Sequence, residues 1–190
     1  MKIAGVLLAA GKSERFRGQK LLSEVAGKKL IEWSIKSLQG SGLDALIAVV
    51  SPSLRVTIPY DFAVVVNGEP ELGISHSISL SLSFVEEMDG VLFHLADQPF
   101  VDEGLMKEMV SSFRKDGEKI VAASVNRDPR NPMIFPRKYY QELRSLSGDH
   151  GAKSVALHHP DQLATIEVQE EILLDVDTLS DLEDARKFME

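Results

Sequence analysis

A chain of 190 residues has the length of one ordinary domain, and a composition of 44% hydrophobic and 26% charged residues excludes a disordered or fibrous protein. The absence of cysteine excludes disulfides, thiolate metal sites and a cysteine nucleophile. A net charge of -8 argues against a general nucleic-acid-binding surface, so nucleic acid is not expected as a partner.

The first apolar run, Ile3–Ala9, predicts a strand buried on both faces. The run is too short to span a membrane. The cluster of basic residues near it follows the run, which is the reverse of the order found in a signal peptide. We therefore expect a cytoplasmic protein with no membrane partner.

Short apolar runs alternate with helical patterns along the whole chain, which is typical of an α/β domain. Strands are expected at Ile3–Ala9, Ala45–Val50, Phe62–Val66, Val91–Leu95, Ile120–Ala123, Met133–Phe135 and Ala164–Val168. Helices are expected at Lys29–Leu38, Ile74–Glu86, Asp102–Arg114, Lys138–Leu146, Ala152–His158 and Ser180–Met189. The nearly continuous apolar strands indicate a mostly parallel sheet flanked by helices. No repeat or linker interrupts the pattern, so one domain is expected over residues 1–190.

Two connections are expected to be irregular, one over residues 52–59 and one over residues 126–131, because proline and polar residues replace the apolar pattern there. Asp102 and Ser180 are each placed to cap the helix that follows.

The histidines suggest no catalyst. His94 lies within an apolar run and is expected in the core. His158 and His159 are adjacent, so their side chains should diverge, which argues against a metal site built from them. No arrangement of serine, histidine and aspartate can be justified from the spacing.

Small and basic residues follow the first predicted strand, in the run AAGKSERFRGQK that begins at Ala9. In an open parallel sheet, ligands bind outside the carboxyl ends of the strands. Small residues let the backbone approach a polyphosphate, while lysine and arginine side chains neutralise its charge. The run is neither a Walker A loop nor a GxGxxG turn, so an ordinary polar loop with exposed cations is the alternative.

Acidic residues stand at the ends of two further segments. Asp97 lies at the carboxyl end of a predicted buried strand, a place suited to Mg²⁺, which takes one or two carboxylates and leaves other positions to phosphates and water. Asp175 and Asp177 alternate in an extended segment and so project to one face, where one of them would complete the metal site. The alternatives are turn or helix-capping roles.

Together these motifs resemble the nucleotidyltransferase family that includes the molybdenum cofactor cytidylyltransferases, over nearly the whole chain. LAAGKSERFRGQKLL matches the opening family pattern, LADQPFV matches the metal-binding turn, and NPMIFPRKYYQEL, LSGDHGAK and DVDTLSDLEDA match later segments in order. The segment GDHGAK points to this subgroup over other nucleotidyltransferases. LAAG resembles the cytidylyl enzymes, whereas guanylyl relatives tend to have LAGG.

The resemblance implies a Rossmann-like sheet of the nucleotide-diphospho-sugar transferase type that binds a nucleoside triphosphate and Mg²⁺. By position in the motifs, it assigns nucleotide binding to Leu8, Ala9, Ala10, Gly11, Ser13, Arg15, Lys20, Gly73, Ser75 and Ser77. It assigns the metal to Asp97 and Asp177, and the acceptor to Asn131, Asp149 and Gly151. Two positions depart from the family pattern: Arg17 stands where glycine is usual, and His76 stands where a small residue is common.

The implied reaction is attack by the phosphate of a molybdopterin-type acceptor on the α-phosphorus of CTP, which expels pyrophosphate. Arg15, Lys20 and Asp97 are the implied catalytic residues, since positioning and charge neutralisation carry most of the catalysis of such displacements. A molybdoenzyme is implied as a further partner. The alternatives are use of another nucleotide, transfer to a sugar or polyol phosphate, and a non-catalytic chaperone that delivers a pterin to a dehydrogenase.

Overall fold

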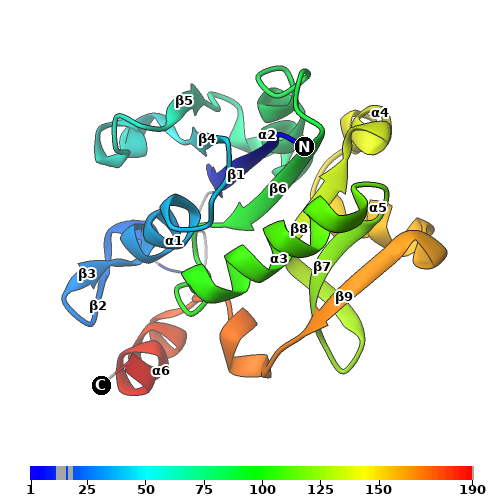
Figure 1. Cartoon of the computed structure of the whole chain (residues 1–190). Coiled ribbons are helices and arrows are strands. Elements are labelled where there is room, and N and C mark those ends of the chain that lie inside the picture. Colours follow the sequence, from blue (N-terminus) through cyan, green and yellow to red (C-terminus); the bar gives the residue numbers. More distant parts are fainter. Residues whose placement is uncertain (12–15, 17–18, 190) are drawn as a thin grey trace.

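The computed structural model describes residues 1–11, 16 and 19–189. In these residues a seven-stranded sheet has the order β5-β4-β1-β6-β8-β7-β9 (Figure 1). Its strands are β1 (Ile3–Ala9), β4 (Ala45–Val50), β5 (Ala63–Val66), β6 (Gly90–Leu95), β7 (Ile120–Val125), β8 (Asp128–Pro136) and β9 (Leu163–Glu167). Strand β8 is antiparallel to β6 and β7, and the other neighbouring pairs are parallel. The predicted mostly parallel sheet flanked by helices is therefore confirmed.

Helices cover both faces of this sheet and enclose two apolar cores. One core contains side chains of α1 (Leu30–Gln39), α3 (Glu103–Asp116) and α6 (Leu179–Met189). The other contains side chains of α2 (Ile74–Leu82), α4 (Tyr140–Arg144) and α5 (Ala152–His158). Successive side chains of β1 point to opposite faces of the sheet. Leu7 therefore packs into the first core and the next residue, Leu8, into the second. Figure 1 shows α1 and α3 side by side across the front of the sheet.

The ends of the helices follow local capping chemistry. Asp102 caps α3 as predicted, because its carboxylate accepts a hydrogen bond from the Leu105 N–H at 2.8 Å. The prediction that Ser180 caps the last helix is wrong. The Thr178 hydroxyl accepts the N–H of Asp181 at 3.2 Å, and the Asp181 carboxylate accepts the N–H of Thr178 at 2.7 Å. This reciprocal capping box begins α6 at Leu179.

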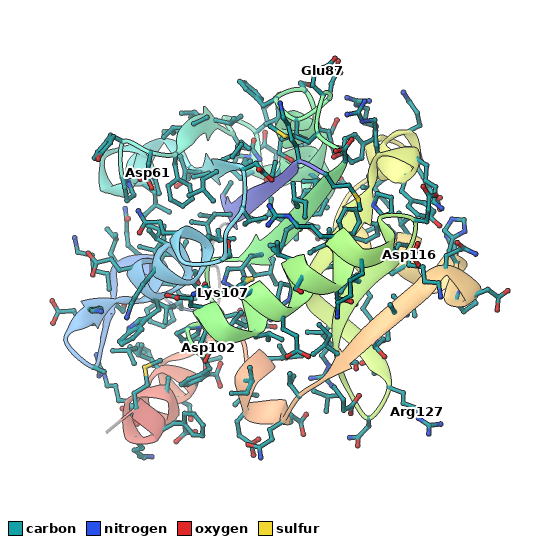
Figure 2. The ribbon with its side chains drawn as sticks, in the orientation of Figure 1. Asp61, Glu87, Asp102, Lys107, Asp116 and Arg127 are labelled. Carbon is teal, nitrogen blue, oxygen red and sulfur yellow. The ribbon has the colours of Figure 1, made fainter. Side chains whose placement is uncertain are left out.

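The prediction of an irregular segment over residues 126–131 is wrong for its last four residues, 128–131. Strand β8 already begins at Asp128, where it pairs with Val125 of β7 across a tight hairpin. Asn126 and Arg127 form the hairpin turn with left-handed backbone angles, φ 51° and φ 67°. The Arg127 side chain extends from the tip of the hairpin (Figure 2). The strand was expected only at Met133–Phe135, and its start was missed because its first residues are polar and lack the apolar alternation that marks a half-buried strand.

Short elements complete the chain. Strands β2 (Glu24–Val25) and β3 (Lys28–Lys29) form an antiparallel ribbon before α1. The expected irregular connection after β4 contains a 3₁₀ segment, Pro52–Thr57. In the described part of the chain, no helix combines the length and the apolar character needed to cross a bilayer.

Candidate active site

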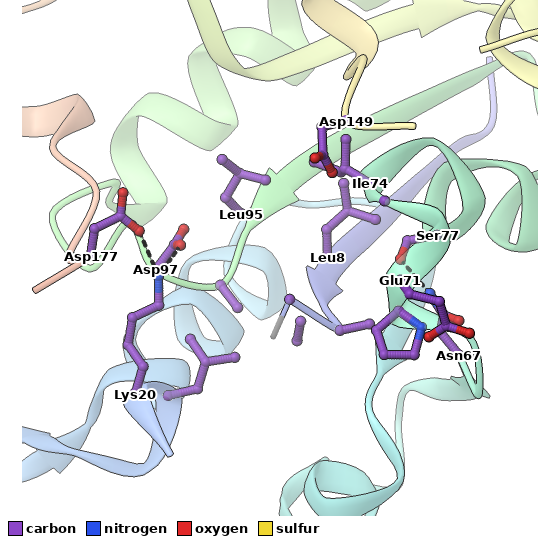
Figure 3. A pocket seen from close by; sticks show the side chains of 17 residues that line it. Leu8, Lys20, Asn67, Glu71, Ile74, Ser77, Leu95, Asp97, Asp149 and Asp177 are labelled. Atoms are coloured by element: carbon purple, nitrogen blue, oxygen red, sulfur yellow. Dashed lines mark hydrogen bonds and ion pairs between the residues drawn. The ribbon is translucent and has the colours of Figure 1, made fainter. Parts of the chain in front are cut away.

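A pocket of about 430 Å³ opens where β1 and β6 end, at the carboxyl edge of the sheet. The Ala96 N–H donates to the Leu8 carbonyl at 3.1 Å and holds these two strand ends together. Figure 3 shows Lys20, Asp97 and Asp177 at one end of the pocket and Asn67, Glu71 and Ser77 at the other. The site therefore lies where ligands bind in open parallel sheets.

Three charged side chains meet at the first end of the pocket. The Lys20 ammonium donates to Asp97 Oδ2 at 2.6 Å and to Asp177 Oδ1 at 3.0 Å. The Lys20 side chain is 9% exposed, while those of Asp97 and Asp177 are 22% and 32% exposed. Burial alone would lower the pKa of Lys20, but attraction by the two carboxylates outweighs it and raises the pKa above its usual value. Lys20 is therefore charged at neutral pH.

Asp175 adds a third carboxyl group to this end. Desolvation raises its pKa to about 6, and the negative charges of Asp97 and Asp177 act in the same direction. Three carboxyl groups thus lie near one ammonium group, an arrangement that favours binding of a further cation.

The orphaned oxygen of Asp97 indicates where a cation would be held. Asp97 Oδ1 is buried and accepts no hydrogen bond from any residue that the structure describes. A buried carboxylate oxygen without a partner is costly, and a divalent cation removes that cost. No three His, Asp or Glu side chains of the described residues form a complete metal cage. The donors present fit Mg²⁺ or Mn²⁺, which would fill its other positions with phosphate oxygens and water.

The other end of the pocket combines neutral and acidic groups. The Asn67 amide donates to the Ser77 hydroxyl at 3.0 Å, and Asn67 is fully buried. Gly73 has a φ of 83°, and a Cβ atom there would lie 2.3 Å from the carbonyl group of Gly148. Only glycine therefore fits the contact between this turn and the segment that carries Asp149.

The structure brings ten of the predicted site residues together as pocket lining. They are Leu8, Ala9, Ala10, Gly11, Lys20, Gly73, Ser77, Asp97, Asp149 and Asp177.

The remaining predicted site residues are placed differently. Ser75, Asn131 and Gly151 are outside the lining. The Ser75 N–H donates to the Gly148 carbonyl at 3.2 Å, and Gly151 packs beside Ile74, which does line the pocket. Ser13 and Arg15 lie outside the described residues.

Several lining residues were missed by sequence reasoning. Asn67 and Glu71 line the pocket, and so do Leu21, Ile74 and Leu95. Asn67 follows the third predicted strand directly, so the strand-end rule that singled out Asp97 would also have found it.

The histidines are partly as expected. His94 is fully buried, as predicted. The prediction that His158 and His159 diverge is wrong, since their ring nitrogens lie 3.4 Å and 2.7 Å from the two carboxylate oxygens of Glu142. The cause is that α5 ends at His158, and the non-helical backbone of His159 (φ -124°, ψ 55°) turns its ring back toward the same carboxylate.

A sequence model of the MobA-like NTP transferase domain matches residues 5–163 of the chain. The chain belongs to this family. The matched region runs from β1 to the first residue of β9 and contains every residue of the pocket lining except Asp177. Membership of this family makes the protein a nucleotidyltransferase by family and implies that it binds a nucleoside triphosphate.

Known proteins are similar to this MobA-like domain over different shares of their length. The bifunctional protein GlmU of Thermoanaerobacter pseudethanolicus is 26% identical over 154 residues, which are 76% of this chain and 31% of that protein. The chain thus spans about a third of the curated relatives that it matches. The crystal structure of Rv0371c from Mycobacterium tuberculosis H37Rv has a TM-score of 0.83 at 24% identity, with 98% of each chain covered.

Two further structures carry ligands. A complex of Rv0371c with manganese has a TM-score of 0.77 at 23% identity and covers 98% of this chain and 99% of that one. A CMP:2-keto-3-deoxy-manno-octonic acid synthetase with CTP has a TM-score of 0.75 at 15% identity, with 100% and 98% covered. At these identities the likeness concerns the fold, which is that of the nucleotidyltransferases.

Proposed function

We propose that this MobA-like domain transfers CMP from CTP to the phosphate of a molybdopterin-type acceptor in the cytoplasm and releases pyrophosphate. The observation that carries the proposal is the contact of Lys20 with Asp97 and Asp177 at the end of the pocket. An ammonium and two carboxylates beside the small-residue turn Ala9–Gly11 suit a polyphosphate and its divalent cation.

The reaction is an in-line displacement at phosphorus. An oxygen of the acceptor phosphate forms a bond to the α-phosphorus of CTP, and the bond from that phosphorus to the bridging oxygen of pyrophosphate breaks. The leaving pyrophosphate takes the electron pair, and Lys20 and Arg15 offset its negative charge. An ionised acceptor phosphate needs no general base, and no histidine is among the described residues that line the pocket.

Asp97 and Asp177 would hold Mg²⁺. The orphaned Oδ1 of Asp97 supports this assignment, because it is the buried oxygen that a cation would satisfy. When bound, the metal would neutralise phosphate oxygens and so favour attack by an anion. Manganese in the related Rv0371c structure supports a divalent cation.

We assign the choice of nucleotide to the turn after β1 and to the end of the pocket that contains Asn67 and Ser77. Ala10 lines the pocket, and the buried pair of Asn67 and Ser77 lies at the end remote from Lys20. We assign the base to this end and infer a pyrimidine from the resemblance of LAAG to the cytidylyl enzymes. The CTP in the related synthetase supports the same choice.

The acceptor is assigned to the side of the pocket formed by the GDHGAK segment. Asp149 lines the pocket, and the Gly148 carbonyl accepts the Ser75 N–H at 3.2 Å, which joins this segment to the nucleotide side. We assign acceptor contacts to Asn131, Asp149 and Gly151. A molybdoenzyme would be the partner that uses the product.

Transfer of CMP to a sugar or polyol phosphate is the second candidate. The observation that favours it is the similar fold of a synthetase that forms a CMP derivative of a sugar acid. Both candidates share the displacement at phosphorus and differ only in the acceptor.

The two candidates are separated by a screen of ATP, GTP, UTP and CTP against purified molybdopterin, a sugar 1-phosphate and a polyol phosphate. We expect the fastest pyrophosphate release with CTP and molybdopterin. Asp61→Ala, which removes an exposed carboxylate that is not among the lining residues, is the control and should keep wild-type rates. Faster release with a sugar phosphate would favour the second candidate, and binding of molybdopterin without release from any nucleotide would favour a chaperone.

A further inference from the structure

The two carboxylates that face Lys20 come from separate parts of the chain. Asp97 follows β6, whereas Asp177 belongs to the segment before α6. Asp177 also lies beyond the residues that match the family. Something must therefore hold residues 173–177 against the turn after β6.

A backbone contact and the side chain of Gln98 make that connection. The Val176 N–H donates to the Asp97 carbonyl at 2.9 Å. The Gln98 amide donates to the Leu173 carbonyl at 3.3 Å. One buried side chain thus reaches the segment that carries Asp177.

Gln98 is only 2% exposed, and its Oε1 atom accepts no hydrogen bond from the residues that the structure describes. Burying an amide costs free energy unless its hydrogen bonds offset that cost. An apolar side chain of the same length would fill this space without leaving an oxygen unpaired. Packing alone therefore does not account for an amide at this position. Its N–H group does, because it donates to the Leu173 carbonyl.

We propose that Gln98 is a positioning residue that fixes residues 173–177 against the turn after β6, so that Asp97 and Asp177 can bind the same cation. The proposal rests on the proposed function in that it takes this cation to be the metal of nucleotidyl transfer. Gln98 itself is not among the residues that line the pocket. Its loss should loosen the carboxylate pair and leave the nucleotide end of the pocket unchanged.

The test uses Gln98→Met, which keeps the length of the side chain and removes its donors. Mn²⁺ binding is measured by electron paramagnetic resonance in the presence of CTP and without acceptor, so that no transfer occurs. We expect Mn²⁺ affinity to fall about tenfold, the effect of losing about 1–1.5 kcal/mol of hydrogen bonding. Hydrogen exchange of the Val176 amide should rise by a similar factor, because its segment opens more often.

Turnover supplies a third readout. In Gln98→Met the metal concentration for half-maximal rate should rise, while KM for CTP at saturating metal stays within about twofold of wild type. Ser41→Ala is the matched control. It removes a buried hydrogen bond from a side chain to a backbone carbonyl, that of Leu38, at the end of α1, and should lower Tm without changing Mn²⁺ affinity.

Wild-type Mn²⁺ affinity and wild-type exchange at Val176 in Gln98→Met would overturn the proposal. If this variant does not fold, Gln98→Asn decides in the same way, since it keeps the amide and shortens its reach by one methylene. If the wild-type protein transfers no nucleotide to any acceptor, the proposed function fails. The exchange of Val176 in the variant still decides whether Gln98 positions the segment.

Discussion

Replacing Lys20 by methionine removes the ammonium group and leaves a side chain of similar length. Asp97 and Asp177 then face each other without the cation that contacts them at 2.6 Å and 3.0 Å. Removing one partner of a buried ion pair costs about 3–5 kcal/mol. Because the carboxylates are 22% and 32% exposed, water screens part of their repulsion, and we expect a loss of about 2–3 kcal/mol.

For a chain of this length, that loss corresponds to a fall in Tm of roughly 4–12 °C, from about 2–4 °C per kcal/mol. The measurement is thermal unfolding at pH 7.5. The folded pKa of Lys20 is raised, so its stabilisation is complete below the unfolded pKa near 10.5 and is lost only as pH rises through the folded value. At pH 7.5 the full effect is therefore present.

Magnesium distinguishes this account from a simple packing defect. Mg²⁺ should raise the Tm of Lys20→Met more than that of the wild type, because the divalent cation neutralises the carboxylates that Lys20 no longer contacts. CTP use should still fall by about ten- to two-hundredfold, the effect of losing one charge-assisted phosphate contact of about 1.5–3 kcal/mol.

The control for Lys20→Met is Lys107→Met, which breaks an exposed pair with Glu103 within α3 and should change stability by less than about 1 kcal/mol. An unchanged Tm in Lys20→Met, or an equal response of both proteins to Mg²⁺, would refute the reasoning.

Three further substitutions test other parts of the account. Asp97→Ala should abolish Mg²⁺-dependent turnover while the protein still unfolds cooperatively; near-normal turnover would contradict its role. Ala10→Gly should reduce the preference for CTP over GTP, measured as the ratio of their kcat/KM values. The reduction should correspond to no more than about 1–3 kcal/mol, the usual contribution of one methyl group in a pocket. An unchanged ratio would show that the turn does not select the base. Burial lowers the pKa of His94 to about 3, so its contribution to stability is complete above the unfolded pKa near 6.5 and is lost as pH falls. At pH 5 the loss is about 2 kcal/mol, and His94→Leu should flatten the Tm profile between pH 6.5 and 4.5; an acid slope equal to wild type would show that another group causes it.

Local patterns predict the elements that bury continuous apolar residues. The bounds of β1 and β4 agree with the predictions, and so do those of α5. Strand β8 begins earlier than predicted because its first residues are held by pairing with β7, a contact that no local pattern contains. The β2–β3 ribbon was missed because its strands are only two residues each, which is too short for a local pattern to show.

The site could be predicted to the extent that strand ends determine it. Asp97 and Asp177 were expected to come together, and they share Lys20 as a partner. Lys20 was expected to contact phosphates. Its contact with both carboxylates could not be predicted, because it depends on which segments distant in the sequence pack beside Lys20. The connection through Gln98 depends in the same way on where the C-terminal segment packs.

The central claim is transfer of a nucleotide to a phosphate acceptor. The most direct measurement quantifies pyrophosphate and the CMP-bearing acceptor in the same reaction of CTP, Mg²⁺ and molybdopterin. Transfer predicts equal amounts of the two products, and neither product when the acceptor or the metal is omitted. Pyrophosphate formed without a nucleotide-bearing acceptor, or no pyrophosphate from CTP with any phosphate acceptor, would contradict the account.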